Sequence, residues 1–535
     1  MTAQAQSHAY VWTTVEIQLE SHRDRENPYL DVDVEAVFTG PNGEQIKRPA
    51  FWNGGRSWLI RFAPTRPGLW TYRVNCGDPT DGGLNGLAGS IVGVEADSTA
   101  SDIYRHGFLR SAERYLAFDD GTPFFWLGDT HWRFLWEKWD EASKTGWHSQ
   151  FREMVDRRVE QGFTVYQTNL LSFEDGWNAA ACWATGEEYR RIDVGFFESV
   201  VDPRMAYIAD AGLVNAMGLA WHEAIDHPDA PAGLARLARY VVARYGSLPM
   251  VWTMAGEVAG YNPALREARI NGWRTVAKAI AETDGYGHPR TAHLTNERPI
   301  ASYYQNEDWL TLTLNQLGHG DHDLNPKHYI DFRAQHPNMP LVEGEALYEG
   351  LSSVESVGRR TVTETMVRQV AYRAIQSGCC GYTYGAQGCW NNARDIEDGA
   401  TTWGNLPWFE GIDLPGATQL GHLRRFYSDI DWSQLRPDAE CFVTEDIFNR
   451  MFFLPSVSSN RLRTTVVAYF GETYRNGGGA ARLTHLAERP YELRWFDPRC
   501  GDYSAAESSV VPTHGMLAIP DKPDDGDWIR LAEAL

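Results

Sequence analysis

Two glutamates, each placed where a short apolar segment ends, are the residues of this chain best suited to acid–base chemistry. Glu345 lies in the stretch Leu341–Gly350 (LVEGEALYEG), and Glu257 directly follows Pro249–Gly256 (PMVWTMAG). A short apolar run that ends in an acid is typical of a buried strand that opens into a site. Paired carboxyl groups can cleave a glycosidic bond, one as proton donor and one as nucleophile. We therefore take Glu257 and Glu345 as the candidate catalytic pair.

The pattern leaves two competitors for Glu345, which are Glu343 and Glu349. Glu343 points to the same side of an extended strand, so periodicity does not separate the two residues. Either member of the catalytic pair could also be a structural acid that forms a salt bridge at a strand end. Glu349 is a third acid in the same stretch.

The elements around the pair alternate between strands and helices. Strands are predicted at 123–127, 163–168, 213–221, 250–254, 290–294, 310–314, 340–342 and 379–384, and helices at 147–159, 234–245, 270–282, 362–375 and 417–427. Eight alternating strands predict an α/β fold, the (β/α)8 TIM barrel, whose functional residues emerge at the C-terminal strand ends. The fourth and seventh strands would bring Glu257 and Glu345 to one mouth.

Short strands separated by turns lie on both sides of this region. They predict an N-terminal β-sandwich of fibronectin or immunoglobulin type at residues 1–98, a barrel at 99–436 and a C-terminal β-sandwich at 437–535. We expect both sandwiches to pack on the barrel through Phe51, Trp52 and Trp495, since these offer apolar surface. Self-association into a homo-oligomer is the alternative use of that surface.

Polar residues at the predicted strand ends, together with tryptophans of the loops, are candidates for binding a sugar. The predicted substrate-binding residues are Asp129, His131, Trp132, Asn169, Trp177, Trp221, His222, Gln316, His319, Tyr384 and Trp390. Each tryptophan could instead pack the barrel, and each histidine could be a satisfied core residue.

Charge and cysteine content narrow the class of protein. The 535-residue chain has a net charge of -22, which disfavours binding to nucleic acid or to an anionic membrane surface. No apolar run is long enough for a membrane span, and residues 1–9 lack the features of an export signal. Seven scattered cysteines indicate reduced thiols. We expect a cytoplasmic protein that needs no cofactor.

Two other classes of function compete with the carboxylate hypothesis. The segment 222–227 (HEAIDH) resembles a zinc signature, and His319 and His322 could add ligands to a metal-dependent hydrolase. Zinc sites of that type need two histidines one helical turn apart, whereas the spacing here is five residues, so we predict no metal site. The second alternative is a non-catalytic carbohydrate-binding protein. Serine-hydrolase, Walker and Rossmann signatures are absent from the sequence.

Four blocks of the chain carry a family resemblance: 121–132 (GTPFFWLGDTHW), 161–167 (QGFTVYQ), 345–350 (EALYEG) and 384–387 (YGAQ). They resemble the apiosidase-like glycoside hydrolases, family 140 and relatives. The N-terminal region resembles the β domain that commonly precedes that barrel. The C-terminal block 495–501 (WFDPRCG) resembles the β domain, associated with collagen binding, that commonly follows it.

The resemblance implies a retaining glycosidase whose acid/base follows strand four and whose nucleophile follows strand seven. These roles fall on Glu257 and Glu345, although Gly256 stands where many retaining barrel glycosidases have asparagine. Long loops rich in glycine and aromatic residues after strands two and six suggest exo action on short oligosaccharides or glycosides. A pentoside or a furanoside is compatible with this hypothesis.

Overall fold

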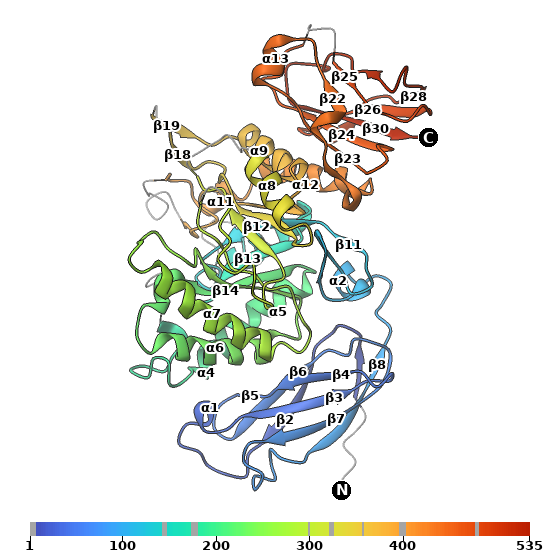
Figure 1. The fold of residues 1–535 in the computed structure, drawn as a ribbon. Helices are drawn as coiled ribbons and strands as arrows, with labels where there is room; N and C mark the ends of the chain where they lie inside the picture. The colour runs from blue at the N-terminus through green and yellow to red at the C-terminus, as the bar shows by residue number, and fades with distance from the viewer. Residues whose placement is uncertain are drawn as a thin grey trace.

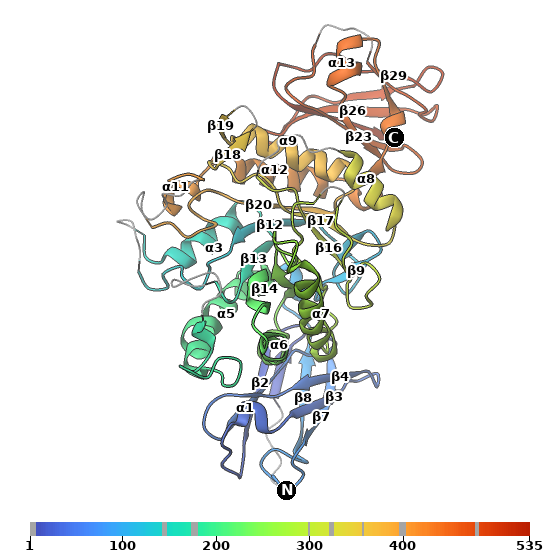
Figure 2. The same ribbon diagram turned by 60° about the vertical axis from the view of Figure 1, so that its left-hand side comes forward.

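The computed structural model describes residues 7–141, 147–172, 180–297, 300–319, 326–355, 358–394, 403–476 and 481–535. A barrel of parallel strands forms the middle of the molecule, and a β-rich part lies at each end of it (Figure 1). The same arrangement is seen after rotation (Figure 2). None of the described helices is long and apolar enough to cross a membrane.

Seven parallel strands form the barrel wall in the order β15-β14-β13-β12-β20-β17-β16. Their bounds are β12 Trp126–His131, β13 Val165–Asn169, β14 Val214–Trp221, β15 Met250–Gly256, β16 Thr313–Gln316, β17 Leu341–Glu345 and β20 Gly381–Tyr384. Residues 290–294 fill the eighth position, because Arg290 bridges Trp252 of β15 and His293 bridges Leu314 of β16. The predicted α/β barrel is confirmed, although its fifth strand is reduced to isolated bridges.

Helices cover the outside of the barrel. Their bounds are α3 Gln150–Glu160, α4 Val194–Phe196, α5 Asp202–Asp210, α6 Ala230–Tyr245, α7 Arg266–Thr283, α8 Pro326–Gln335, α9 Glu364–Gln376, α11 Trp408–Gly411 and α12 Pro415–Ser428. Every residue of β13, β15 and β17 is buried. Burial on both faces explains the apolar run of β15, whereas β13 and β17 begin with apolar residues and bury polar side chains toward their C-terminal ends.

The first barrel strand begins later than predicted. Pro123–Phe124 forms β11, an edge strand of a small antiparallel sheet with β10 (Tyr115–Ala117) and β9 (Arg110–Ala112). Proline has no N–H for a central ladder and is tolerated at a sheet edge. As a consequence β12 extends to His131, and Asp129 lies inside the strand rather than beyond its end.

The N-terminal part is built from two facing sheets, β1-β8-β7-β3-β4 and β2-β6-β5. Phe38 and Phe62, one from each sheet, stack with ring centroids 3.8 Å apart. The expected contact with the barrel is present: Phe51 lies under the guanidinium of Arg244 in α6, and the Tyr240 hydroxyl donates to Trp52 O at 3.1 Å. The bounds are β1 Ser7–Tyr10, β2 Val15–Glu20, α1 Pro28–Asp31, β3 Val34–Thr39, β4 Gln45–Pro49, β5 Phe51–Trp52, β6 Ser57–Phe62, β7 Gly68–Cys76, β8 Ala88–Val94 and α2 Asp102–His106.

The C-terminal part also has two sheets, β21-β23-β24-β30-β26-β27 with β28 paired to β26, and β22-β25-β29. Trp495 packs inside this part against Phe470, so its expected contact with the barrel is wrong. The next residue, Phe496, contacts Phe426 of α12 instead, because successive residues of a strand point to opposite faces. The bounds are β21 Arg436–Pro437, β22 Phe442–Val443, α13 Ile447–Phe452, β23 Ser456–Ser459, β24 Thr465–Phe470, β25 Arg482–Leu483, β26 Tyr491–Asp497, β27 Asp502–Tyr503, β28 Glu507–Val510, β29 Leu517–Ala518 and β30 Trp528–Ala534. In the barrel region, β18 Ser352–Glu355 and β19 Gly358–Thr361 form a two-stranded sheet between β17 and α9.

Candidate active site

Glu257 follows β15 in an unusual backbone conformation. Its φ is +46°, and Met254, three residues earlier, has φ +58°. Non-glycine residues in this region cost on the order of 1 kcal/mol each and are common at functional sites. Gly256 precedes the acid, and a Cβ at this position would lie 2.4 Å from the Trp221 ring. Close packing of Trp221 on Gly256 therefore accounts for the lack of an asparagine before Glu257.

Glu345, the last residue of β17, is 5% exposed and lies among nitrogen donors. Its Oε1 lies 3.0 Å from Gln316 Nε2 and 3.0 Å from His319 Nε2. Its Oε2 lies 3.2 Å from His293 Nε2, close enough for attraction although outside hydrogen-bond geometry. Burial alone would raise the pKa of Glu345, but His293 and His319 outweigh it and hold this pKa well below its usual range. The carboxyl group is therefore ionised at neutral pH.

The two histidines differ in the contact made by Nδ1. His293 Nδ1 accepts the backbone N–H of Glu257 at 3.4 Å, so the Nε2–H of this ring faces Glu345. His319 Nδ1 lies 2.8 Å from Ala346 O, and both ring nitrogens of His319 therefore lie against acceptors.

One amide group connects the two candidate glutamates. Gln316 Nε2 lies 3.0 Å from Glu257 Oε1 and 3.0 Å from Glu345 Oε1. The two N–H bonds of a primary amide diverge by about 120°, so the two oxygen atoms that they meet lie about 5 Å apart. The Tyr261 hydroxyl also donates to Glu257 Oε1, at 2.6 Å. Glu257 and Glu345 thus face each other across a single side chain.

Glu343 lies in a different environment from Glu345. Its Oε2 accepts from Asn315 and from the Tyr329 hydroxyl of α8, each at 2.6 Å, and its Oε1 accepts the backbone N–H of Leu317 at 2.7 Å. The strand register explains why two residues of equal parity diverge: Asn315 pairs with Glu343 but Gln316 pairs with Glu345, which leaves Gly344 as an extra residue. The irregularity directs Glu343 toward α8.

A cavity of about 300 Å³ lies against both candidate catalytic residues. Four tryptophans dominate its walls, and flat indole faces are suited to stacking on sugar rings. Of the predicted substrate-binding residues, five line the cavity: Trp132, Trp221, His222, His319 and Trp390. The complete lining is Trp132, Trp221, His222, Glu223, Glu257, His319, Glu345, Tyr348, Leu351, Trp390 and Trp403.

The structure places Asp129 and His131 in the barrel core, both fully buried. Asp129 Oδ2 contacts Arg158 Nε at 2.5 Å and His131 Nε2 at 2.7 Å, and His131 Nδ1 lies 3.0 Å from Glu137. Despite the opposing effect of burial, Asp129 and Glu137 raise the pKa of His131. These side chains form an internal ion network and do not line the cavity.

Three further predicted residues also lie off the cavity. Asn169 is fully buried, and neither atom of its side-chain amide has a hydrogen-bond partner. The Tyr384 hydroxyl donates to Glu349 at 2.6 Å, and Gln316 lies beneath the two glutamates, 3% exposed. Trp177 lies outside the described residues.

Several residues of the site were not assigned a role from the sequence. Tyr261, Tyr348 and Trp403 had no signal of their own, although Tyr348 belongs to the block EALYEG that begins with Glu345. The Tyr348 hydroxyl accepts from Trp132 Nε1 at 3.2 Å. Burial and the charge of Glu345 raise the pKa of Tyr348 well above its usual value, so its phenol remains a neutral donor. His293 could have been found, because it lies at the C-terminal end of the predicted strand 290–294, next to its last residue.

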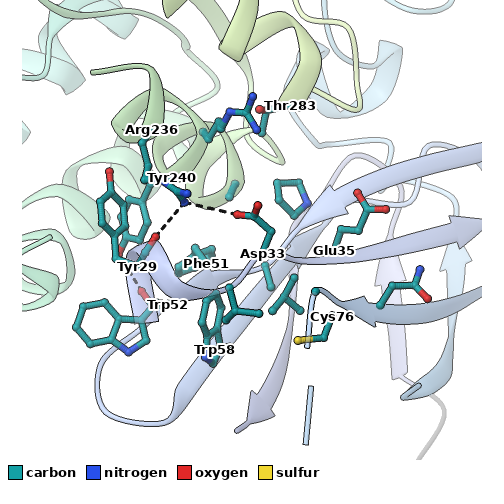
Figure 3. Close-up of a pocket in the computed structure, with 18 of the residues that line it drawn as sticks. Tyr29, Asp33, Glu35, Phe51, Trp52, Trp58, Cys76, Arg236, Tyr240 and Thr283 are labelled. Carbon is teal, nitrogen blue, oxygen red and sulfur yellow. Dashed lines mark hydrogen bonds and ion pairs between the residues drawn. The ribbon is translucent and has the colours of Figure 1, made fainter. Parts of the chain in front are cut away.

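A larger cavity of about 520 Å³ lies between the N-terminal sandwich and helices α6 and α7 (Figure 3). Two of its carboxylates face arginines: Asp33 lies 3.5 Å from Arg236, and Glu282 lies 3.0 Å from Arg239. Acids that are each matched by an arginine are poorly suited to paired acid–base catalysis. The smaller cavity at Glu257 and Glu345 is the better candidate.

The histidines of the zinc-like segment point to different neighbours. His222 lies 3.3 Å from Glu223, whereas the His227 ring stacks on Tyr189. His322 lies outside the described residues. Within the described ranges, no group of three or more histidine, cysteine, aspartate or glutamate side chains could hold a metal ion.

Comparisons with known proteins agree with this barrel architecture. Structures with the same fold include a candidate glycoside hydrolase from Bacteroides vulgatus ATCC 8482, which is 16% identical with a TM-score of 0.70 over 99% of this chain and 100% of that chain. A family 5 glycoside hydrolase from the same organism is 16% identical with a TM-score of 0.64, over 82% of this chain and 96% of that chain. At these identities the likeness shows the shared fold.

Family models identify two regions of the chain. Residues 8–77 match a domain of unknown function, DUF5060, and no curated protein matches the sequence. Residues 110–434 match the model described as apiosidase-like, catalytic domain. Since this match spans more than half of the chain, the protein belongs to the apiosidase-like family and is a glycoside hydrolase.

Proposed function

We propose that this glycoside hydrolase acts with retention of anomeric configuration, with Glu345 as the nucleophile and Glu257 as the acid/base. The observation that carries the proposal is the Gln316 amide, which donates to both carboxyl groups at 3.0 Å. The resulting separation of about 5 Å is that of retaining enzymes, whereas inverting enzymes need about 6.5–9.5 Å to admit a water molecule. The depressed pKa of Glu345 supports its role as an ionised nucleophile.

The reaction proceeds in two steps. Glu345 attacks the anomeric carbon, the glycosidic C–O bond breaks, and Glu257 gives its proton to the departing oxygen. Glu257 then removes a proton from a water molecule that attacks the same carbon, which cleaves the glycosyl ester and frees Glu345. His293 and His319 stabilise the negative charge of Glu345 before the ester forms and after it is hydrolysed.

We assign the sugar contacts to residues that line the cavity. Trp132 and Trp221 pack edge to face with centroids 5.2 Å apart, and Trp390 lies 6.1 Å from Tyr348. These rings form a rigid aromatic wall, and His222 supplies a polar group at the rim. A volume of about 300 Å³ is at the lower end for ligand pockets, which favours the end unit of a glycan and thus exo action.

The proposed mechanism is tested by the stereochemistry of the first product. An aryl glycoside panel of pentosides and hexosides, furanosides included, identifies a substrate, and proton NMR then follows the anomer released. We expect the anomer of the substrate to appear first. Release of the opposite anomer would contradict retention, and rapid internal cleavage of a polymer would contradict exo action.

Chemical rescue of alanine variants distinguishes the nucleophile from the acid/base. We expect Glu345→Ala to lose activity by at least about 10³-fold and to regain glycoside cleavage with azide, which forms a glycosyl azide. Glu343→Ala is the matched control on the same strand, and rescue of this variant instead would reassign the nucleophile. Loss of activity with a chelator would favour a metal-dependent hydrolase, and sugar binding without turnover in the wild type would favour a binding protein.

We further propose that the enzyme works in a reducing compartment, in keeping with the cytoplasmic location expected from the sequence. All seven cysteines lie in the described part of the chain and are free thiols, five of them buried. Cell fractionation tests this proposal, and recovery of the mature protein from the medium would contradict it.

A further inference from the structure

Gln316 is one of the residues predicted to bind the sugar, but both N–H donors of its side chain already contact carboxyl groups of the protein. A primary amide nitrogen carries two hydrogens, and those of Gln316 are directed at Glu257 Oε1 and Glu345 Oε1. The ionised carboxylate of Glu345 only accepts hydrogen bonds, so the nitrogen of the amide and not its oxygen faces Glu345. Gln316 is 3% exposed and does not line the cavity.

We infer that Gln316 is a positioning residue of the reaction: its amide sets the separation and orientation of Glu257 and Glu345 and does not bind the sugar. This inference rests on the proposed retaining mechanism and adds to it the group that holds its two carboxyl groups in place.

The backbone of β16 supports this role. The register between β16 and β17 shifts between Asn315 and Gln316, opposite the extra residue Gly344. A Cβ at Gly344 would lie 2.4 Å from the side chain of Leu314, so the leucine packs in the space that a larger residue at position 344 would fill. Bulges commonly redirect a side chain next to an active site. Here Asn315 donates a hydrogen bond to Glu343, and its neighbour Gln316 donates one to Glu345.

An uncharged hydrogen-bond donor, such as an amide, suits a site in which two acids lie close together. Two ionised carboxylates about 5 Å apart repel each other, and the repulsion would shift one of them or keep it protonated. An amide offsets the repulsion without adding a charge, whereas lysine or arginine would bind one carboxylate as an ion pair and hold it ionised. The groups that face Glu345 from neighbouring elements are Gln316, His293, His319 and Tyr348. Gln316 also donates to the Glu257 carboxyl group, whereas His293 contacts the backbone N–H of Glu257.

The test uses Gln316→Met, which keeps the length of the side chain and removes both donors. Loss of a hydrogen bond to a charged group predicts a fall in kcat of about 10- to 100-fold. KM should change less than about twofold, because uniform binding of the sugar is untouched. The acid limb of the pH–activity profile, set by Glu345, should move to higher pH, because donors that favour its ionised form are lost.

Asn315→Leu is the matched control. It removes the neighbouring buried amide, which donates to Glu343 at 2.6 Å. We expect a lower melting temperature and an unchanged acid limb. Gln316→Glu is the second variant, in case Gln316→Met does not fold: a third carboxyl group of the same shape should move the acid limb further upward.

The inference is overturned if Gln316→Met raises KM and leaves the acid limb of the pH–activity profile in place. That result is the one expected if Gln316 binds the sugar. It is also overturned if Asn315→Leu moves the acid limb as far as Gln316→Met does. Failure of the retaining mechanism is seen separately, as full activity of Glu345→Ala or as release of the inverted anomer by the wild type.

Discussion

A buried acid four residues after Glu345, Glu349, provides a quantitative test of the structure. It is 2% exposed and accepts from the Tyr384 hydroxyl at 2.6 Å and from Gly416 N at 2.9 Å. Burial, with the nearby charge of Glu364, outweighs these hydrogen bonds and raises the pKa of Glu349 to about 7. The pKa of glutamate in an unfolded chain is near 4.3, so ionisation of Glu349 costs the folded state about 3 kcal/mol more than it costs the unfolded state.

The direction of the pH dependence follows from the raised pKa of Glu349. Below pH 4 its carboxyl group is protonated in both the folded and the unfolded state, so it does not change the free energy of unfolding. Between about pH 4 and 7 the unfolded state alone loses the proton, so the free energy of unfolding falls as pH rises, and the full penalty applies above pH 7. Glu349→Gln cannot ionise and avoids this penalty. We expect the stability of the variant relative to the wild type to increase by about 3 kcal/mol from pH 4 to pH 8.

Urea unfolding of both proteins at several pH values, followed by tryptophan fluorescence, measures this difference. Glu364→Gln is a useful control, because it removes one charge that raises the pKa and should reproduce only a small part of the effect. A stability gap between Glu349→Gln and the wild type that stays constant with pH would refute the reasoning. A gap that shrinks with rising pH would show that Glu349 is held ionised.

Two further predictions concern Glu257. Gly256→Ala places a Cβ within 2.4 Å of Trp221, so we expect a loss of about 1–3 kcal/mol in stability and a clear fall in kcat/KM. Removal of the indole also removes the clash, so the losses of Gly256→Ala and Trp221→Ala should be less than additive in the double variant. Equal stability of Gly256→Ala and the wild type would contradict the packing. Tyr261→Phe removes the 2.6 Å hydrogen bond that helps to hold the Glu257 carboxyl group in place, so we expect kcat/KM to fall by about 10-fold. Unchanged kcat/KM would show that Tyr261 does not position Glu257.

The barrel could be predicted from the sequence because its strands are buried on both faces. Every residue of β15 is buried, which produces an apolar run that ends at Glu257. The segment 290–294 has the composition of a strand and occupies the position of one, yet it pairs only through isolated bridges. Amino-acid composition predicts that a segment is buried. The number of residues that pair with adjacent strands depends on segments that are distant in the chain.

The polar residues of β12 show where this reasoning stops. Asp129 and His131 were expected to face a ligand because polar side chains in an apolar setting commonly mark a site. Instead they are satisfied internally by Arg158 and Glu137. Arg158 lies on α3, and nothing in the local pattern of β12 indicates that a helix would deliver its charge into the barrel core.

The choice between Glu343 and Glu345 has a similar physical cause. A regular strand would direct both side chains to one face, and a single irregularity opposite Gly344 separates them. The positions of such bulges depend on how two strands fit together. Their effect on the site is large, because they decide which acid reaches the cavity and place Gln316 beside it.

The central claim, that Glu345 attacks the sugar across from Glu257, is tested most directly by trapping the covalent intermediate. A 2-deoxy-2-fluoro glycoside of the preferred sugar slows hydrolysis of the ester, and mass spectrometry of the digested protein then locates the label. We expect the sugar on Glu345. A label on Glu343 or on any other residue, or an enzyme that turns over the parent glycoside yet never accumulates a labelled form, would contradict the account.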